Sequence, residues 1–138
     1  MSPLLLSFAL SVSSQTTSTL EIDVVGLRNT RGFLEACLTQ DRARFPDCSS
    51  DPHAVSATVQ ASLGRLIFSG VAPGEYAVLL FHDQNANRRL DTLLGIPREG
   101  FGFSRNPIVR FGAPRYDKVN IQLAPGFTRI SVKLQYLL

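Results

Sequence analysis

Residues 76–81 read YAVLLF, a run in which every side chain is apolar or aromatic. A strand with one solvated face alternates polar and apolar residues. A run that is apolar on both faces therefore predicts a central strand covered on both sides. Outward from this stretch, a repeat of period two dominates the chain, which is typical of half-buried strands with one solvated face. This alternation covers residues 20–24, 34–38, 55–60, 118–123 and 129–136, and residues 64–69 add one further short strand.

Turn signals separate these stretches. GVAPG at 70–74 and APG at 124–126 place Pro shortly before Gly, which suits a tight turn. No helical period of useful length is present. The pattern predicts an all-β protein, an antiparallel β-sandwich of about seven strands with one long loop.

Length and composition restrict the class of protein. The 138 residues are 44% hydrophobic and 18% charged, enough for one domain with its own core. Two cysteines exclude a disulfide-dense miniprotein and a four-cysteine zinc site. The net charge of +3 comes mostly from arginine, since Lys118 and Lys133 are the only lysines. No basic stripe or recognisable module accompanies it, so we expect no nucleic-acid partner.

The first residues, 1–14, read MSPLLLSFALSVSS. The apolar run at 4–12 has the length of a signal-peptide core and is too short to span a bilayer, which needs about 20 residues. No basic residue precedes Arg28, so a weak signal, a start further upstream and a first strand all stay open. We expect a signal or apolar segment at 1–14, a single domain at 15–138, and a periplasmic or secreted protein without a transmembrane segment.

Cys37 and Cys48 flank the ten-residue loop LTQDRARFPD. A loop of this length closes readily with a disulfide, and an even cysteine count fits an exported protein. The alternative is a pair of unrelated thiols. We predict a disulfide between Cys37 and Cys48. The two histidines, His53 and His82, lack the spacing of a metal site.

A repeat of oxygen-bearing residues follows the central strand, in the pattern D-x-N-x-N-x-R-x-D. This is the order in which calcium loops supply their oxygen ligands. We therefore predict a weak Ca²⁺ site, with Ca²⁺ as the candidate cofactor. Arg88 stands where such loops have Gly, and Leu94 where they have Glu. A metal-free turn held by Asx side chains remains the alternative. The proposed ligands are Asp83, Asn85, Asn87, Arg89 and Asp91.

The stretch 82–118 has little periodicity, and a connection of that length is usually functional. Its Phe and Arg residues predict a recognition surface. The predicted partner-binding residues are Arg98, Phe101, Phe103, Arg105, Arg110 and Phe111.

No catalytic triad emerges, so we expect no enzyme and favour a non-enzymatic binding or assembly module with a protein partner. A carrier of an apolar pigment or lipid is the first alternative. A hydrolase-like enzyme using His82, Asp83 or Glu99 is the second.

The run HDQNANRRLDTLLGIPREGFGFSRNP at 82–107 resembles the signature of a family of small exported bacterial proteins of unknown function. GVAPGEYAV at 70–78 and FGAPRYDKVNIQL at 111–123 extend the resemblance. It implies export and a sandwich of the transthyretin or carboxypeptidase-regulatory type. A more distant likeness is to calcium-binding B-type repeats of bacterial surface proteins, which carry D-x-N-x-D-G-x-x-D on a sandwich loop.

Overall fold

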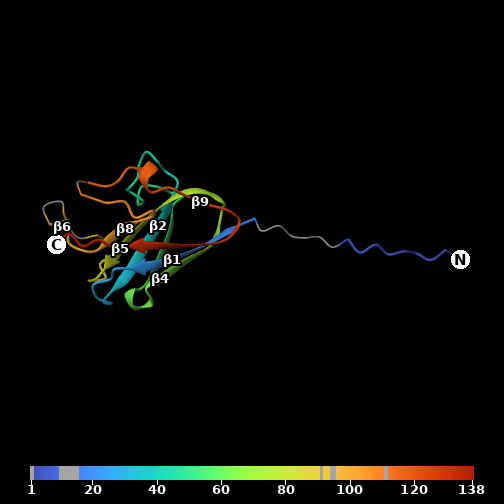
Figure 1. The fold of residues 1–138 in the computed structure, drawn as a ribbon, viewed down its shortest axis with the longest axis horizontal. Coiled ribbons are helices and arrows are strands. Elements are labelled where there is room, and N and C mark those ends of the chain that lie inside the picture. Colours follow the sequence, from blue (N-terminus) through green and yellow to red (C-terminus); the bar gives the residue numbers. More distant parts are fainter. Residues whose placement is uncertain (1, 10–15, 91, 94–95, 111) are drawn as a thin grey trace.

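Two β-sheets packed face to face build the domain (Figure 1). A computed structural model describes residues 2–9, 16–90, 92–93, 96–110 and 112–138. The first sheet has the strand order β10 (Gly126–Lys133), β1 (Ser18–Val25), β4 (Arg65–Val71). The second has the order β3 (Val55–Gln60), β2 (Phe33–Thr39), β5 (Gly74–Asp83), β8 (Phe101–Phe103). The all-β sandwich is thereby confirmed.

Shorter elements complete the structure. The strand β9 (Ile121–Leu123) pairs with the beginning of β5, and β6 (Thr92–Leu93) pairs with β7 (Ile96–Pro97). Two 3₁₀ turns, η1 (Ala61–Leu63) and η2 (Tyr116–Lys118), are the helical elements of the described residues.

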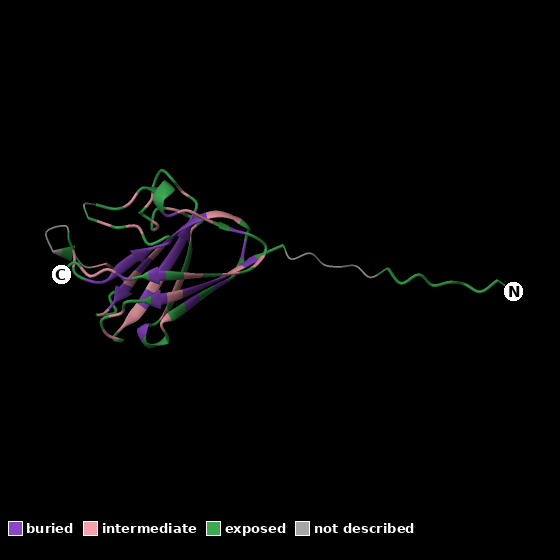
Figure 2. Ribbon diagram, viewed as in Figure 1, coloured by how far each residue is buried: buried purple, intermediate pink, exposed green. Residues whose placement is uncertain are grey.

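The main core lies between the sheets, where β1, β2, β4 and β5 each contribute buried side chains (Figure 2). Alternate residues of the long strands point into it, as the period of two predicts. They include Leu20 and Ile22 of β1, Leu34 and Leu38 of β2, and Val78 and Leu80 of β5, all at most 2% exposed.

Three details differ from the sequence prediction. The pair β1 and β10 is parallel, with Ser18 opposite Gly126 and Val25 opposite Lys133. Alternation reports which face a side chain takes and says nothing of strand direction. Residues 116–118 form a 3₁₀ turn where a strand was expected to begin, and the long stretch contains β6, β7 and β8.

The segment GFGF at 100–103 packs tightly against the last strand. The side chains of Phe101 and Phe103 point away from the core between the two sheets. The Gly positions that alternate with them therefore face β10. A Cβ on Gly102 would lie 2.7 Å from Val132 Cγ1 and 2.8 Å from the Lys133 carbonyl oxygen. Glycine therefore permits this close approach.

Asn106 continues the contact between the two sheets. Its side-chain amide donates to the Ser131 carbonyl at 3.1 Å and accepts from the Lys133 amide at 2.8 Å. Phe101 and Gln135 form a further bridge between backbone groups. The two Asn106 bonds occupy an acceptor and a donor that β10 would otherwise expose as an edge strand.

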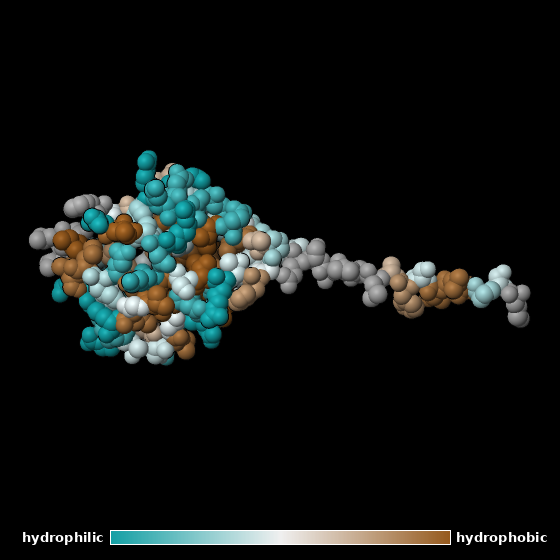
Figure 3. Space-filling view, in the orientation of Figure 1, coloured by the Kyte–Doolittle hydropathy of each residue, from teal (hydrophilic) through white to brown (hydrophobic). Residues whose placement is uncertain are grey.

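Residues 2–9 lie apart from the sandwich as an extended tail (Figure 1). Leu4, Leu5 and Phe8 are more than four-fifths exposed, and the apolar patch they form is visible in Figure 3. Residues 10–14 of the predicted signal segment lie outside the described residues. Among the residues that are described, none belongs to a helix of the length and apolar character needed to cross a membrane.

Candidate functional site

The outer face of the second sheet, turned away from the first sheet, carries a second apolar cluster. Ala77, Leu79 and Phe81 of β5 point to this face, opposite to Val78 and Leu80. Around them gather Phe45, Phe101, Phe103, Val109, Tyr116 and Val119. The YAVLLF strand is thus covered on both sides, as its sequence predicts.

A cavity of about 320 Å³ lies within this outer cluster. Its volume falls in the range of small-molecule sites, roughly 300–1,000 Å³. The strands β5 and β8, the loop after β2 and the stretch before η2 supply most of its walls, and Leu90, Pro97 and Leu137 add to them. Apolar wall residues include Pro46, Leu79, Phe81, Phe101, Phe103 and Val109. Of the described lining residues, Arg110 is the one that carries a charge.

A second, more polar hollow adjoins the cavity. The two share Pro46, Leu79, Phe81 and Leu90 as walls. The second hollow adds charged residues, with Glu35 on β2 and Asp47, Arg88 and Arg89 on loops. The outer face therefore combines an apolar cavity with a charged extension.

The loop after β2 forms one wall because a disulfide holds it against the sheet. Cys37 and Cys48 are bonded, with Cα atoms 6.6 Å apart, which confirms the predicted pairing. Phe45 of this loop packs edge-on against Phe103 and Tyr116, with ring centroids 6.0 and 5.8 Å apart. The loop thereby presents an aromatic side chain to the outer cluster.

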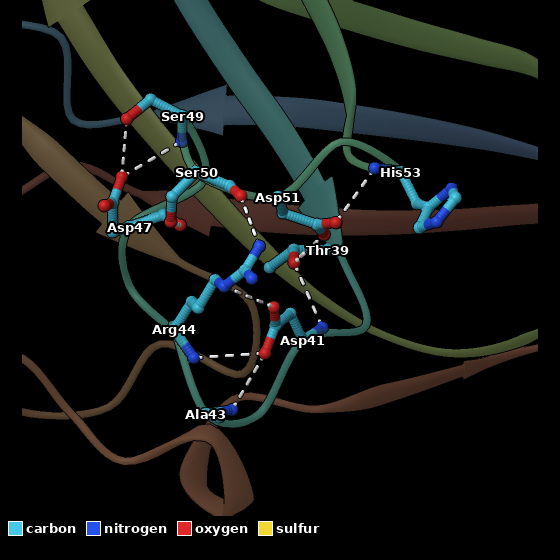
Figure 4. A network of polar contacts seen from close by, with 9 residues as sticks. All are labelled: Thr39, Asp41, Ala43, Arg44, Asp47, Ser49, Ser50, Asp51 and His53. Carbon is cyan, nitrogen blue, oxygen red and sulfur yellow. Dashed lines mark hydrogen bonds and ion pairs between the residues drawn. The ribbon is translucent and has the colours of Figure 1, made fainter.

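Polar contacts within the same loop fix its shape (Figure 4). The Thr39 hydroxyl donates to the Asp51 carboxylate at 2.7 Å and accepts from the Asp41 amide at 3.1 Å. That hydroxyl holds the pKa of Asp51 below its usual range. The Asp41 carboxylate in turn accepts from the amides of Ala43 and Arg44. The wall is therefore a preformed element tied to the end of β2.

The turn after β5 is closed by its own side chains. Asp83 is fully buried. One of its carboxylate oxygens accepts from the backbone amide of Asn87 at 3.1 Å, and the other accepts from the backbone amide of Arg88 at 2.7 Å. The Asn87 side chain accepts from the Arg89 amide at 2.9 Å. Arg88 adopts a positive φ of 61°, the conformation for which calcium loops place Gly at this position.

Within the described residues, no three or more His, Cys, Asp or Glu side chains gather as a metal site would require. Asp91 lies outside the described residues, so the ligand set Asp83, Asn85, Asn87, Arg89 and Asp91 stays a prediction. The hydrogen bonds of Asp83 and Asn87 match the alternative, an Asx turn held by local amides.

The three acid–base candidates each have a structural role. His82 is fully buried, with Nε2 2.6 Å from the Arg31 carbonyl and Nδ1 3.0 Å from the Tyr136 hydroxyl. Since a carbonyl only accepts, Nε2 carries a hydrogen and donates it to Arg31, while Nδ1 shares a hydrogen bond with the tyrosine hydroxyl. Asp83 closes the turn, and the Glu99 carboxylate accepts from the backbone amide of Gln84 at 2.6 Å.

Gly32 is a further positioning residue for this turn. Its φ is +68°, and a Cβ there would lie 2.0 Å from the Asp83 carbonyl oxygen. The chain segment that bonds His82 can approach the end of β5 because position 32 lacks a side chain.

Glu35 is the group that sequence reasoning missed. Alternation along β2 places it on a solvated face, which is wrong because the disulfide loop and the Asp83 turn flank that face. Among the residues that the structure describes, none forms a hydrogen bond with one of the carboxylate oxygens of Glu35, which is buried. Burial, and next the neighbouring Asp83 charge, raise the pKa of Glu35, while Arg88 opposes the shift. A signal was present: Cys37, two residues along on the same face, is bonded to the loop.

The predicted partner-binding residues separate into two groups. Phe101 and Phe103 are buried in the cavity wall, where they offer no exposed recognition surface. Arg98, Arg105 and Arg110 are exposed, and Arg105 also bonds the Asp117 carbonyl and the Asn120 side chain. Phe111 lies outside the described residues.

A family model described as an uncharacterized protein conserved in bacteria, DUF2141, matches residues 22–131. The chain belongs to the DUF2141 family. Neither the curated proteins nor the solved structures contain a match to this DUF2141 chain. The matched range contains the strands that line both hollows, the disulfide and the Asp83 turn. Of the described residues that line the cavity, Leu137 lies outside this range.

Proposed function

We propose that this protein is an exported, non-enzymatic binding module that holds an apolar small molecule in the cavity on the outer face of its five-stranded sheet. The observation that carries the proposal is the cavity itself. Its walls are apolar, and Leu79 and Phe81 line it from a central strand. A preformed apolar pocket of this size favours ligands that bury most of their own surface.

The position of the aromatic residues favours a small molecule over a protein partner. Phe101 and Phe103 would anchor a protein interface if they were exposed, since such anchors dominate binding energy. They point into the cavity wall instead. An assembly role would have to use the exposed residues nearby, of which Ile108 is the most apolar at 80% exposed.

The bonding of the acid–base candidates supports a non-enzymatic role. Both ring nitrogens of His82 and both carboxylate oxygens of Asp83 are engaged within the fold. A general acid or base needs to reach a substrate proton within hydrogen-bond distance.

A titration with the neutral fluorescent probe N-phenyl-1-naphthylamine tests the proposal. We expect saturable fluorescence enhancement with the wild-type protein. Val109→Trp should fill the cavity and weaken binding at least tenfold. Ile108→Trp is the matched control, because Ile108 is exposed and lies outside the cavity wall. Absence of saturable binding, or equal affinity in both variants, would contradict the proposal. Mass spectrometry of an organic extract of the native protein should identify a bound apolar compound.

A further inference from the structure

We infer that the ligand is a single-chain amphiphile with an anionic head group, whose chain fills the cavity and whose head group lies against Arg110. This inference rests on the proposed function and adds the chemical class of the ligand. Arg110 is the charged residue of the described cavity wall, and it also lines the open hollow formed by residues 108–110 and 112–114. One side chain thus borders both the apolar interior and solvent.

The charge of Arg110 is available to a ligand. Within the described part of the chain, no carboxylate forms an ion pair with it. Arg42, Arg65 and Arg129, by contrast, are each paired with Glu or Asp at 2.5–3.3 Å. A guanidinium at the mouth of an apolar cavity complements a carboxylate, which it can bind through two parallel hydrogen bonds.

The acidic residues near the cavity also leave an anionic head group favoured over a cationic one. Glu35 and Asp47 border the adjoining hollow and are not part of the cavity wall. The stretch 98–118, which contains Arg110, has five basic residues and two acidic residues. The described cavity wall therefore offers an anionic head group the positive charge of Arg110, which would repel an ammonium head group.

The size of the cavity selects the number of chains. Its 320 Å³ is at the small end of ligand sites, so it suits one alkyl chain better than a two-chain lipid. Each further methylene that enters the cavity should tighten binding about fourfold until the cavity is full.

Displacement of N-phenyl-1-naphthylamine by three ligands of equal chain length tests the head-group assignment. The ligands are dodecanoate, dodecanol and dodecylamine, each used below its micellar concentration. We expect dodecanoate to bind about fivefold more tightly than dodecanol, and dodecylamine most weakly. The preference for dodecanoate should shrink as salt is raised. Equal affinity for dodecanoate and dodecanol would overturn the inference and leave the cavity proposal intact, whereas failure of the probe itself to bind would overturn both.

Arg110→Gln provides the residue-level test. We expect it to remove the fivefold preference for dodecanoate and to leave dodecanol affinity unchanged, with Arg110→Lys retaining part of the preference. Arg115→Gln is the matched control, because Arg115 is also exposed and lies outside the cavity wall. An unchanged preference in Arg110→Gln would overturn the assignment of Arg110. The comparison of ligands on wild-type protein remains decisive should the variant fail to fold.

Discussion

The two faces of β5 are equally apolar in sequence, yet they are buried in different ways. On the inner face, Val78 and Leu80 pack between two sheets and are at most 2% exposed. On the outer face, Leu79 and Phe81 are half-buried beneath loops and border a cavity. Two sheets bring regular rows of side chains together, which interdigitate to high density. Loops lack such rows, so a sheet covered by loops can retain a hollow, and here that hollow is the candidate site.

The largest expected effect comes from truncating one Leu on each face of the second sheet, Leu38 of β2 on the inner face and Leu79 of β5 on the outer face. Leu38→Ala, in the inner core, should cost about 3 kcal/mol of unfolding free energy because it leaves a void in a close-packed region. Leu79→Ala should cost about 1 kcal/mol, since its side chain already borders a cavity. Urea denaturation measures both values. Equal costs would contradict the contrast between the two faces.

Removal of the disulfide should weaken the outer face selectively. Replacing Cys37 and Cys48 together with Ala should cost about 2–3 kcal/mol, because the unfolded chain is no longer constrained. The loop wall should then also loosen, so we expect lower affinity for N-phenyl-1-naphthylamine. Urea denaturation and probe titration measure the two effects. A loss of stability with unchanged probe affinity would show that the loop is not an essential wall.

Glu35 makes the outer face sensitive to pH. Its pKa in the folded protein is above its ordinary value of 4.5, because of burial and then the Asp83 and Glu99 charges, with Arg88 opposing. The folded state therefore binds the proton more tightly, and stability decreases as pH rises from 4.5 through the raised pKa. Glu35→Gln should thus stabilise the protein at pH 7.5, by less than about 1 kcal/mol, and should stabilise it less at pH 4.5. A variant less stable than wild type at pH 7.5 would contradict this account.

The Asp83 turn offers a smaller effect. Ala86 has a φ of 57°, which costs a residue with a Cβ about 1 kcal/mol. Ala86→Gly should relieve that strain. Because Gly also loses more conformational entropy on folding, we expect a net gain in unfolding free energy of about 0.5 kcal/mol. Ala43→Gly is the control, since Ala43 has no positive φ and should gain nothing. A thermal melt compares the two.

Calcium should have the smallest effect, because the Asp83 and Asn87 oxygens already accept local amide hydrogens. We expect the same melting temperature in chelator and in about 10 mM Ca²⁺, which exceeds the dissociation constant expected of a weak extracellular site. A rise in melting temperature that Asp83→Asn abolishes would instead establish the calcium loop.

Much of the fold followed from particular residues. Alternation identified the long strands, YAVLLF identified the doubly covered strand, and the Cys37–Cys48 spacing identified the disulfide. The parallel pairing of β1 and β10 was not predictable, because alternation is the same in both strand directions. Glu35 was assigned to solvent because its cover comes from a loop that follows β2 in the chain.

The sequence by itself determined where strands form and which side chains share a face, because both depend on a local period of two. It also determined that the chain has more basic than acidic residues, and many aromatic residues, after β5. Only the tertiary structure decided what covers the outer face. Bringing Phe45, Phe103 and Val109 together depends on long-range packing, and the volume left between them depends on how closely loops can follow a sheet.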